Sequence, residues 1–356
     1  MIKKLENTEK TLRDLFGRGF IKSYILLVGY EGNEWQINSP DVNADTYFDA
    51  ASLGKILPTT PLALMAIDRG LLSLDDTLEK FFDNVPDDKK NITVKQLLTH
   101  TSGIIRKEYT DGVADRGRES IAEFIFSHPV AFAPDTNIAY SCSGMVLLGF
   151  IIEKVYGMPL DKCLDEHICK VLGLTRTKYN VALDEPNSVV CHYDPTVNDC
   201  RLYDNNVCKM DGIPSGAGED FVTARDLKVY AEALIKRDNR LYGREMFDLS
   251  ERNHTENLCV LESEKCRAVE NRALGFVYVD ENCVQARELF PKGSIGHTGW
   301  TGQSLYLYRE KGLYTILLTD SMRCVNRNYG VCDSERVHEM RTEVHRAIAK
   351  DLGIRN

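Results

Sequence analysis

Hydrophobic residues near the amino terminus change from helical spacing to a continuous apolar run. Residues 24–30 are apolar and β-prone, and the turn residues 31–33 separate them from a second candidate strand over 34–38. This arrangement predicts a β-hairpin. The segment before it predicts an amphipathic helix, because its apolar residues recur at roughly helical spacing: Leu5, Leu12, Leu15 and Phe16.

Helical patterns and loops dominate the middle of the chain, from about residue 52 to residue 265. Residues 146–155 predict a buried helix that ends at Gly157, because glycine readily adopts the left-handed conformation found after a helix. Residues 224–235 predict another helix. Strand character returns near the carboxyl end, over 273–279, 303–308 and 313–319. A last amphipathic helix follows, with Val337, Met340, Val344 and Ile348 on its apolar face.

Strands at both ends with helices between them predict an α+β fold. We expect one antiparallel sheet built from both termini and flanked by helices, interrupted by a large, mainly helical insertion. The predicted sheet lobe comprises residues 1–55 and 266–356, and the predicted helical lobe comprises residues 56–265. Ser52 lies where the first lobe passes into the insertion, and the loop 294–302 lies where the chain returns. An active site is therefore expected at the interface of the lobes.

Charge and composition narrow the classes of partner. The chain has 356 residues and a formal net charge of −9, so no dense basic patch is available to neutralise nucleic-acid phosphates. No stretch approaches the roughly 18 to 20 consecutive apolar residues of a membrane span. A small molecule or a peptide is the expected partner, and the oligomeric state is left open.

Cysteine usage and the amino terminus bear on the cellular compartment. The eleven cysteines are an odd number and include no Cys-x-x-Cys pair, which favours reduced thiols over a disulfide framework. Residues 1–7 lack an apolar core, so no signal peptide is visible. A cytoplasmic location is predicted, although a trimmed export signal would leave the same pattern.

The pair Ser52 and Lys55 can convert an inert hydroxyl into a nucleophile. If Ser52 opens a helix, Lys55 lies three residues later on the same face, where its amine can hold or accept the serine proton. A serine needs such a base near neutral pH for covalent catalysis. Taken alone, Ser-x-x-Lys is a weak signal, because a helix cap and a solvated lysine give the same pattern.

Further motifs follow Ser52 in a fixed order, namely 97–103, 140–142 and 296–302, and with the segments 48–52, 70–76 and 153–157 they extend over nearly the whole chain. In these motifs the chain resembles the serine β-lactamase and penicillin-binding protein superfamily, and within it the class C-like branch. That branch also contains esterases and D-amino-acid peptidases.

The resemblance implies a role for each matching residue. Ser52 would be the acylated nucleophile, Lys55 its proton partner and Tyr140 the second base. Because a free tyrosine has a pKa of about 10, a phenolate needs cationic neighbours, which Lys55 and His297 could supply. The backbone N–H groups of Ser52 and Trp300 would form the oxyanion hole, where one donor is typically worth about 10²–10³ in rate. The substrate would lie along the strand edge at Thr298 and Gly299, since glycine has no side chain to intrude.

Three departures from the family pattern favour an esterase-like or unusual peptide substrate over β-lactam antibiotics. Cys142 replaces the usual asparagine, and a thiol is a weak hydrogen-bond donor and acceptor. His297 replaces a lysine and can be neutral at pH 7, so it anchors a carboxylate less well. Pro58 and Pro61 predict a kink in the expected helix just beyond Lys55.

Several other interpretations of these residues remain open. Cys142 could be a reactive thiol rather than a replacement for asparagine. His100 and Ser102 could form a hydrolytic pair, whereas the resemblance implies a structural turn there. Zinc ligation is disfavoured because the spacing matches no usual pattern in the set Cys191, His192, Cys200 and Cys208.

We therefore expect a serine hydrolase that acts through an acyl-enzyme on an ester or amide, of esterase, β-lactamase or D-peptidase type, and needs no metal or cofactor. The alternative is a catalytically impaired binding or sensor protein on the same scaffold, which recognises peptidoglycan-like or acylated ligands. The replacement of asparagine by Cys142 is the best argument for that alternative.

Overall fold

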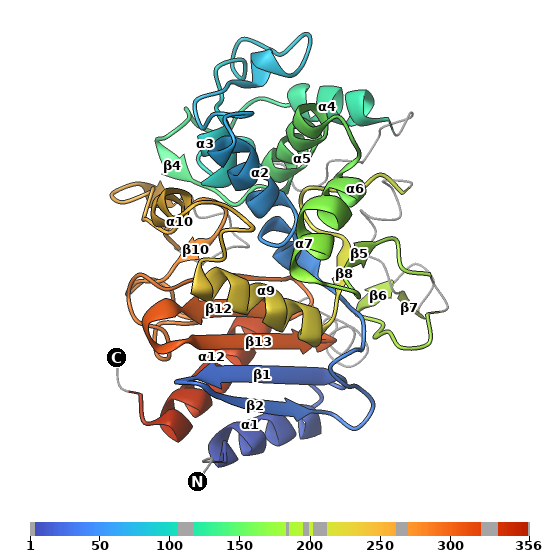
Figure 1. Ribbon diagram of the computed structural model, residues 1–356, viewed down its shortest axis with the longest axis vertical. Coiled ribbons are helices and arrows are strands. Elements are labelled where there is room, and N and C mark those ends of the chain that lie inside the picture. Colours follow the sequence, from blue (N-terminus) through green and yellow to red (C-terminus); the bar gives the residue numbers. More distant parts are fainter. Residues whose placement is uncertain are drawn as a thin grey trace.

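A six-stranded sheet unites the two ends of the chain (Figure 1). The computed structural model describes residues 4–105, 117–182, 185–194, 199–201, 212–260, 270–321 and 334–354. The strand order of the sheet is β10–β11–β12–β13–β1–β2, and all neighbouring strands are antiparallel. The predicted α+β fold is confirmed. The strands are β1 (Tyr24–Tyr30), β2 (Asn33–Asn38), β10 (Val277–Tyr278), β11 (Ile295–Thr298), β12 (Ser304–Tyr308) and β13 (Leu313–Thr319).

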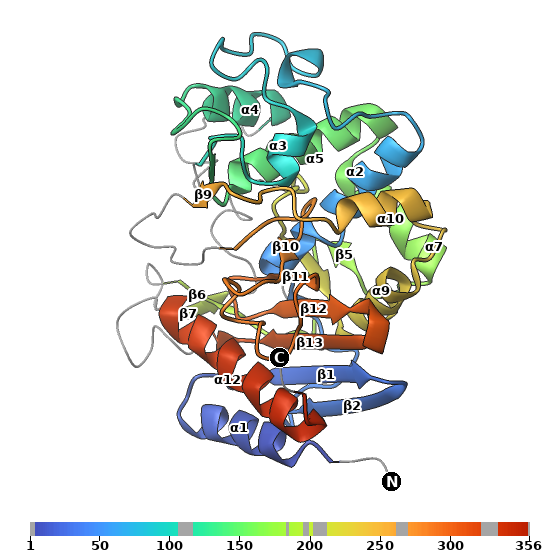
Figure 2. The same cartoon turned by 90° about the vertical axis from the view of Figure 1, so that its left-hand side faces the viewer.

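Helices cover both faces of this sheet (Figures 1 and 2). Helix α9 (Ala224–Lys236) packs on one face, against β1, β12 and β13. Helices α1 (Glu6–Gly17) and α12 (Ser334–Leu352) pack together on the other. Because side chains alternate along a strand, β1 serves both cores: Ile25 and Leu27 belong to the core on the α9 side, and Leu26 and Val28 to the core beneath α1 and α12.

Helix α5 (Cys142–Tyr156) is the buried centre of the helical part and begins four residues before the predicted 146–155 segment. It ends as predicted at Gly157, whose φ is +67°. Among the described residues no single helix is long and apolar enough to cross a membrane; α5 and Leu160–Leu172, bent by 72°, meet that test of length and composition only as a pair. The other helices of this part are α2 (Thr59–Asp68), η2 (Leu78–Lys80), α3 (Val94–Leu98), α4 (Arg118–Phe126), α6 (Leu160–Leu164), η3 (Asp165–Cys169), α7 (Lys170–Leu172) and α10 (Arg244–Ser250).

Short strands that the sequence pattern did not predict support the start of the helical part. Strands β3 (Phe48–Asp49) and β5 (Lys178–Tyr179) both pair with β8 (Asp220–Val222). Two or three residues are too few to show an alternating pattern, which explains why they were missed. The remaining short elements are β4 (Asn137–Ile138), β6 (His192–Asp194), β7 (Asp199–Arg201), β9 (Cys259–Val260), η1 (Ala51–Lys55) and η4 (Arg309–Lys311).

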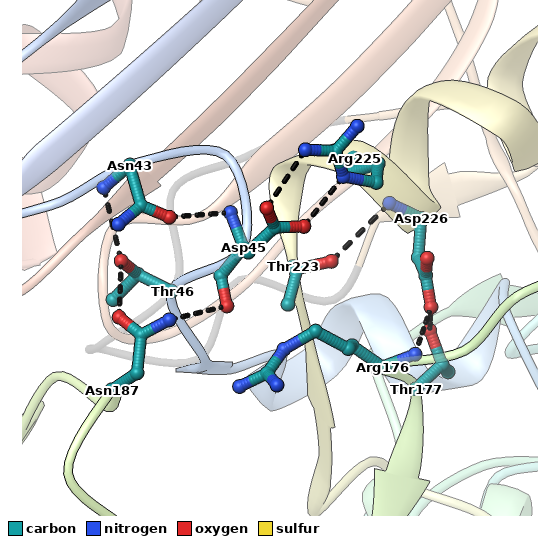
Figure 3. Close-up of polar contacts among 9 residues, drawn as sticks. All are labelled: Asn43, Asp45, Thr46, Arg176, Thr177, Asn187, Thr223, Arg225 and Asp226. Carbon is teal, nitrogen blue, oxygen red and sulfur yellow. Dashed lines mark hydrogen bonds and ion pairs between the residues drawn. The ribbon is translucent and has the colours of Figure 1, made fainter.

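A polar network joins the chain before β3 to the segments on either side of β5 and to the start of α9 (Figure 3). Arg225 forms a bidentate ion pair with Asp45, at 2.5 and 2.7 Å. Asn187 Nδ2 donates to the carbonyl oxygen of Asp45 at 2.9 Å. Asp226 accepts from the Thr177 hydroxyl at 2.9 Å. These contacts tie three distant segments together and so fix the path of the chain into Ser52.

Three local predictions are corrected by the structure. The single helix expected around Lys55 is two helices, because η1 ends at Lys55 and α2 begins after Pro58, which has no N–H to donate to the preceding turn. The strand predicted over 273–279 is reduced to β10. The segment predicted as a loop over 294–302 contains strand β11. The predicted lobe boundaries stay a prediction; α9 comes from the segment assigned to the helical lobe but covers the sheet.

Asp351 offers a test of how the two termini are joined. Its carboxylate, near the end of α12, accepts hydrogen bonds from the backbone N–H groups and side chains of Asn7 and Thr8 in α1. We expect Asp351→Ala to lower the free energy of unfolding by about 2 kcal/mol, because charge-assisted bonds are lost. The exposed Asp14→Ala in α1 is the control, with an expected change below about 0.5 kcal/mol. Urea unfolding measures both.

The same residue gives a pH dependence. Burial alone would raise the pKa of Asp351, but the hydrogen bonds from Asn7 and Thr8 outweigh it and hold the pKa below its usual range in the folded protein. A carboxyl with a lowered folded pKa stabilises above its unfolded pKa, and the contribution is lost as pH falls through the folded value. The difference in free energy of unfolding between wild type and Asp351→Ala should therefore become smaller below about pH 4. A difference that stays constant until the protein unfolds in acid would contradict this role.

Candidate active site

Ser52 follows a sharp turn between β3 and η1. Ala51 has a φ of +49°, in the left-handed region that residues with a side chain seldom adopt. The turn is held from two sides: the Ala50 N–H donates to the carbonyl oxygen of Asp220 at 2.9 Å, and the Ala51 N–H donates to Asp49 Oδ1 at 2.7 Å. Strained backbone of this kind persists only where its surroundings enforce it, and it is frequent at functional sites.

The 3₁₀ form of η1 explains how Ser52 and Lys55 meet. A 3₁₀ helix has three residues per turn, so residues i and i+3 lie directly above one another. The helix also lies unusually close to the segment before β8. A β-carbon at Gly54 would be 2.1 Å from Asp220 Oδ1 and 2.5 Å from Gly218 Cα, so only glycine permits this approach.

Two polar side chains converge on the Ser52 hydroxyl. The Lys55 ammonium nitrogen lies 3.0 Å from Ser52 Oγ, and the Tyr140 hydroxyl lies 2.6 Å from the same atom. Lys55 also donates to the carbonyl oxygen of Ala217. Lys55 is completely buried, whereas Ser52 and Tyr140 are partly buried. Two segments that lie far apart in sequence, η1 and the residues before α5, thus meet at one oxygen.

The start of α5 and a turn after α3 position Tyr140. Ser141 caps α5, since its hydroxyl accepts from the Gly144 N–H at 2.9 Å. The Ser141 N–H donates to His100 Nδ1 at 3.2 Å. The His100 ring packs on the Tyr140 ring, with centroids 4.8 Å apart. The turn role implied for His100 therefore extends to supporting Tyr140.

Burial dominates the ionisation of both partners of Ser52. It raises the pKa of Tyr140 above that of a free phenol, and the Lys55 ammonium only partly opposes this shift. Burial alone would lower the pKa of Lys55, but Cys142 and Tyr140 beside it outweigh burial and leave the pKa raised. At neutral pH the resting pair is therefore an ammonium on Lys55 and a neutral phenol on Tyr140.

His297 lies on β11 and is electrically neutral at pH 7. Its Nδ1–H donates to the carbonyl oxygen of Thr298 at 2.8 Å, which leaves Nε2 without a proton. Burial, followed by the positive charges of Arg272 and Lys55, holds the pKa of His297 well below its usual value. Its ring centroid is 6.1 Å from that of Tyr140. His297 therefore reaches the site but brings no positive charge to it.

The loop between β11 and β12 packs against the turn that carries Ser52. A β-carbon at Gly299 would lie 3.0 Å from the carbonyl oxygen of Ala50, so this glycine allows the close approach. Arg341 of α12 donates to the carbonyl oxygens of Gly299 and Gly302 and holds the loop from behind. Thr298 is partly buried, and Trp300 is 49% exposed at the rim. The oxyanion role of the Ser52 and Trp300 N–H groups stays a prediction.

Cys142 is the first residue of α5 and lies beside Lys55. A hydrogen bond between Cys142 and Lys55 is one of the influences that raise the pKa of the lysine. Cys142 is partly exposed and has a free thiol. The residue thus occupies the position expected from the family pattern, with sulfur in place of an amide.

Asp220 is a site residue that sequence reasoning missed. Its carboxyl group is completely buried beneath Gly54, and neither oxygen has a hydrogen-bond partner within the described part of the chain. Burial raises its pKa to about 7, and Lys55 opposes this effect. Nothing in the sequence near Asp220 distinguishes it from a surface aspartate, because its burial arises only when β8 meets η1.

Two of the open alternatives concern residues outside this cluster. Ser102 Oγ accepts a hydrogen bond from the Ile104 N–H at 3.2 Å, as expected for a structural turn. Among the described residues no group of His, Cys, Asp and Glu side chains is arranged to hold a metal ion. Cys191 is described and buried, but Cys208 and the side chains of His192 and Cys200 lie outside the described residues.

Comparisons with known proteins agree with this arrangement. The family model described as Beta-lactamase matches residues 13–327. A protein of Escherichia coli O157:H7, provisionally named D-alanyl-D-alanine carboxypeptidase, is 29% identical over 167 residues, which cover 43% of this chain and 38% of that protein. The acyltransferase mokF of Monascus pilosus is 27% identical over 242 residues, which cover 59% of this chain and 58% of that protein. The matches thus span less than two thirds of either relative.

Among solved structures, the octameric penicillin-binding protein homologue from Pyrococcus abyssi is similar to nearly the whole chain. The TM-score is 0.74 at 20% sequence identity, over 98% of this chain and 78% of that one. At this level of identity the likeness concerns the fold.

Asp220 gives a testable pH dependence of stability. Its folded pKa of about 7 lies above the ordinary value of 3.8, so folding favours the neutral form. The stabilising contribution is complete below about pH 4 and is lost as pH rises through 7. We compare the free energy of unfolding of Asp220→Asn with that of wild type at each pH. The value for Asp220→Asn minus the value for wild type should be larger at pH 8 than at pH 5 by about 2 to 3 kcal/mol. Urea unfolding at both pH values measures this, and the exposed Asp75→Asn is the control. An equal difference at both pH values would show that the carboxyl is not the group that titrates.

Proposed function

Because the chain belongs to the beta-lactamase family, whose members are serine hydrolases with peptidase, esterase or acyltransferase activity, we propose that it forms an acyl-enzyme on Ser52 with an ester or amide substrate. The observation that carries this proposal is the convergence of the Lys55 and Tyr140 donors on one partly buried hydroxyl oxygen. A completely buried ammonium and a phenol that share one hydroxyl oxygen are suited to remove and return its proton.

In the proposed acylation step Tyr140 acts as its phenolate. The phenolate accepts the Ser52 proton while Ser52 Oγ bonds to the substrate carbonyl carbon, and the carbonyl oxygen becomes an oxyanion. Two backbone N–H groups, those of Ser52 and Trp300, would stabilise that oxyanion. Tyr140 then returns the proton to the departing alcohol or amine as the carbonyl re-forms. The Lys55 ammonium remains charged and stabilises the phenolate throughout.

Deacylation repeats the same sequence with a water molecule or another acceptor. The Tyr140 phenolate takes a proton from the acceptor oxygen, which attacks the acyl carbon, and Ser52 leaves with that proton. With water the product is a carboxylic acid, and with an alcohol it is a new ester. The names of the two relatives span both outcomes, a carboxypeptidase and an acyltransferase.

The surroundings of the site favour an ester or an unusual peptide over a β-lactam. Neutral His297 offers no charge to a substrate carboxylate at the position where β-lactamases usually have a lysine. Cys142 offers a weaker hydrogen bond than the usual asparagine amide. The second candidate, a binding protein that forms no productive acyl-enzyme, rests on this same replacement at Cys142.

The first test concerns the nucleophile. We expect Ser52→Ala to abolish the mass increase produced by a fluorophosphonate probe, because the attacking oxygen is removed while the fold is kept. Intact-mass measurement reads out the adduct directly. Ser102→Ala is the matched control and should label like wild type, which would also exclude the His100 and Ser102 pair. Undiminished labelling of Ser52→Ala would rule Ser52 out.

The second test separates the hydrolase from the binding protein. We expect Lys55→Ala and Tyr140→Phe each to lower the rate of p-nitrophenyl acetate turnover by about 10²- to 10⁴-fold, the usual contribution of a general base. Nitrocefin should be hydrolysed poorly by all forms of the protein. Turnover that is unaffected by either change would defeat the catalytic assignment. No turnover and no adduct in wild type would favour the binding protein.

A further inference from the structure

Arg272, just before β10, is a buried cation that the proposed mechanism does not use. Its side chain is only about 6% exposed, and its guanidinium carbon lies 5.8 Å from the centroid of the Tyr140 ring. Its ion-pair partner among the described residues, Glu270, is 3.7 Å away, beyond good hydrogen-bond distance. Nε and Nη1 have no hydrogen-bond partner in the described part of the chain. Since burying a poorly paired charge is unfavourable, this arginine needs an explanation.

The backbone around Arg272 fixes the direction of its side chain. The Arg272 N–H donates to the Thr255 hydroxyl at 2.8 Å, and its carbonyl oxygen accepts from the His254 N–H at 2.8 Å. The turn that follows is anchored by the Gly275 N–H, which donates to the carbonyl oxygen of Leu98. The main chain at Arg272 is therefore held near Tyr140 without help from the guanidinium, and a side-chain replacement leaves this support in place.

Neither histidine beside Tyr140 can supply positive charge. His100 Nδ1 accepts the Ser141 N–H, and His297 Nδ1 donates to a carbonyl, so each ring has a defined neutral tautomer. Burial, followed by the charge of Arg272, holds the pKa of both histidines well below the usual value. The cations recorded over the Tyr140 ring in the described residues are Lys55, at 5.1 Å, and Arg272, at 5.8 Å.

We propose that Arg272 is a positioning residue of the proton relay, whose fixed charge stabilises the Tyr140 phenolate and replaces the charge that a lysine at the His297 position would bring. This inference rests on the proposed function of Ser52 and Tyr140. A lysine on β11 would act on Tyr140 from that strand, whereas Arg272 acts on it from the segment just before β10. The titratable groups that face this pair are Lys55 from η1, Cys142 from α5, His100 from the turn after α3, His297 from β11 and Glu270 beside Arg272.

The size of the effect follows from the distance. The guanidinium carbon is 5.8 Å from the centroid of the ring over which the phenolate charge is delocalised. A unit charge at about that distance, at an effective dielectric constant of about 20, favours the ionised form by at most roughly two pKa units. Glu270 offsets part of this, so an effect of about one to two units is expected. Where the phenolate is the minor form, that corresponds to a rate about 10- to 100-fold higher.

The test compares Arg272→Met, which keeps the length of the side chain and removes its charge, with Arg272→Lys, which keeps a charge. The rate of fluorophosphonate labelling is followed by intact mass from pH 5 to pH 10. Because the pKa of Tyr140 lies above that of a free phenol, this whole range lies on the acidic limb, and Arg272→Met should lower the labelling rate about 10- to 100-fold throughout it. Arg272→Lys should lower the rate less than about threefold. Arg346→Met, at an exposed ion pair, changes the net charge equally and should leave the rate unchanged.

A second measurement does not depend on activity. All tyrosines are replaced by 3-fluorotyrosine, whose more acidic phenol titrates in a milder pH range. The ¹⁹F resonance of residue 140 is the one that disappears in Tyr140→Phe. Its chemical shift is then followed as a function of pH. Arg272→Met should raise the midpoint of this resonance by about one to two units. A labelling rate that Arg272→Met leaves unchanged, or a midpoint of the ¹⁹F titration that it leaves unchanged, would overturn the inference and leave the proposed function intact. If Arg272→Met shifts the ¹⁹F midpoint but wild type forms no fluorophosphonate adduct, the proposed function is contradicted and the effect of Arg272 on Tyr140 is supported.

Discussion

A completely buried lysine ammonium is the constraint on which the rest of the site depends. Lys55 has no exposed surface, and removing a cation from water is costly unless hydrogen bonds and negative charge replace the lost solvation. The carbonyl oxygen of Ala217, the Ser52 hydroxyl and the Cys142 thiol provide the hydrogen bonds. The close contact between η1 and the segment before β8, which Gly54 permits, brings the Ala217 carbonyl within reach. Local packing around one glycine therefore determines where the cation lies, and the cation in turn opposes the effect of burial on the pKa of Tyr140.

The long elements of the fold could be predicted from sequence because each carries a periodic pattern. Strand β1 and helices α1, α5, α9 and α12 each extend over at least seven residues, enough to display one. The three strands of the small sheet have two or three residues each, and β11 contains a glycine and a histidine, so neither composition nor alternation marks them. Pro58 indicated a disruption beyond Lys55, but not that the chain would break into two helices and leave Ser52 and Lys55 on a 3₁₀ turn.

The residues of the site likewise divide into those that the sequence predicted and those that it did not. Ser52, Lys55 and Tyr140 belong to short motifs whose order along the chain carries information, and the structure brings them together. Asp220 and Arg272 belong to no such pattern, and His100 lies in the motif 97–103 but is expected there only in a structural turn. They become site residues because the turn after α3 and the approach to β10 meet at the Tyr140 ring, while strand β8 meets η1. A buried polar atom without a partner is the signal that reveals them, and it exists only in three dimensions.

The departures at Cys142 and His297 can now be considered together as one redistribution of charge. In a site with a lysine on β11, that cation can serve both the phenol and a substrate carboxylate at the strand edge. Here His297 is neutral, and the second cation lies at Arg272, over the face of the Tyr140 ring and with almost no exposed surface. A charge in that position can act on the phenol through the low-dielectric interior but presents little to a ligand in solvent. Under the proposed function, this arrangement would separate the activation of the base from the recognition of an anionic substrate. Such a site would retain acyl chemistry while losing a reason to prefer carboxylate-bearing substrates, which agrees with the proposed ester or unusual peptide as the acyl donor.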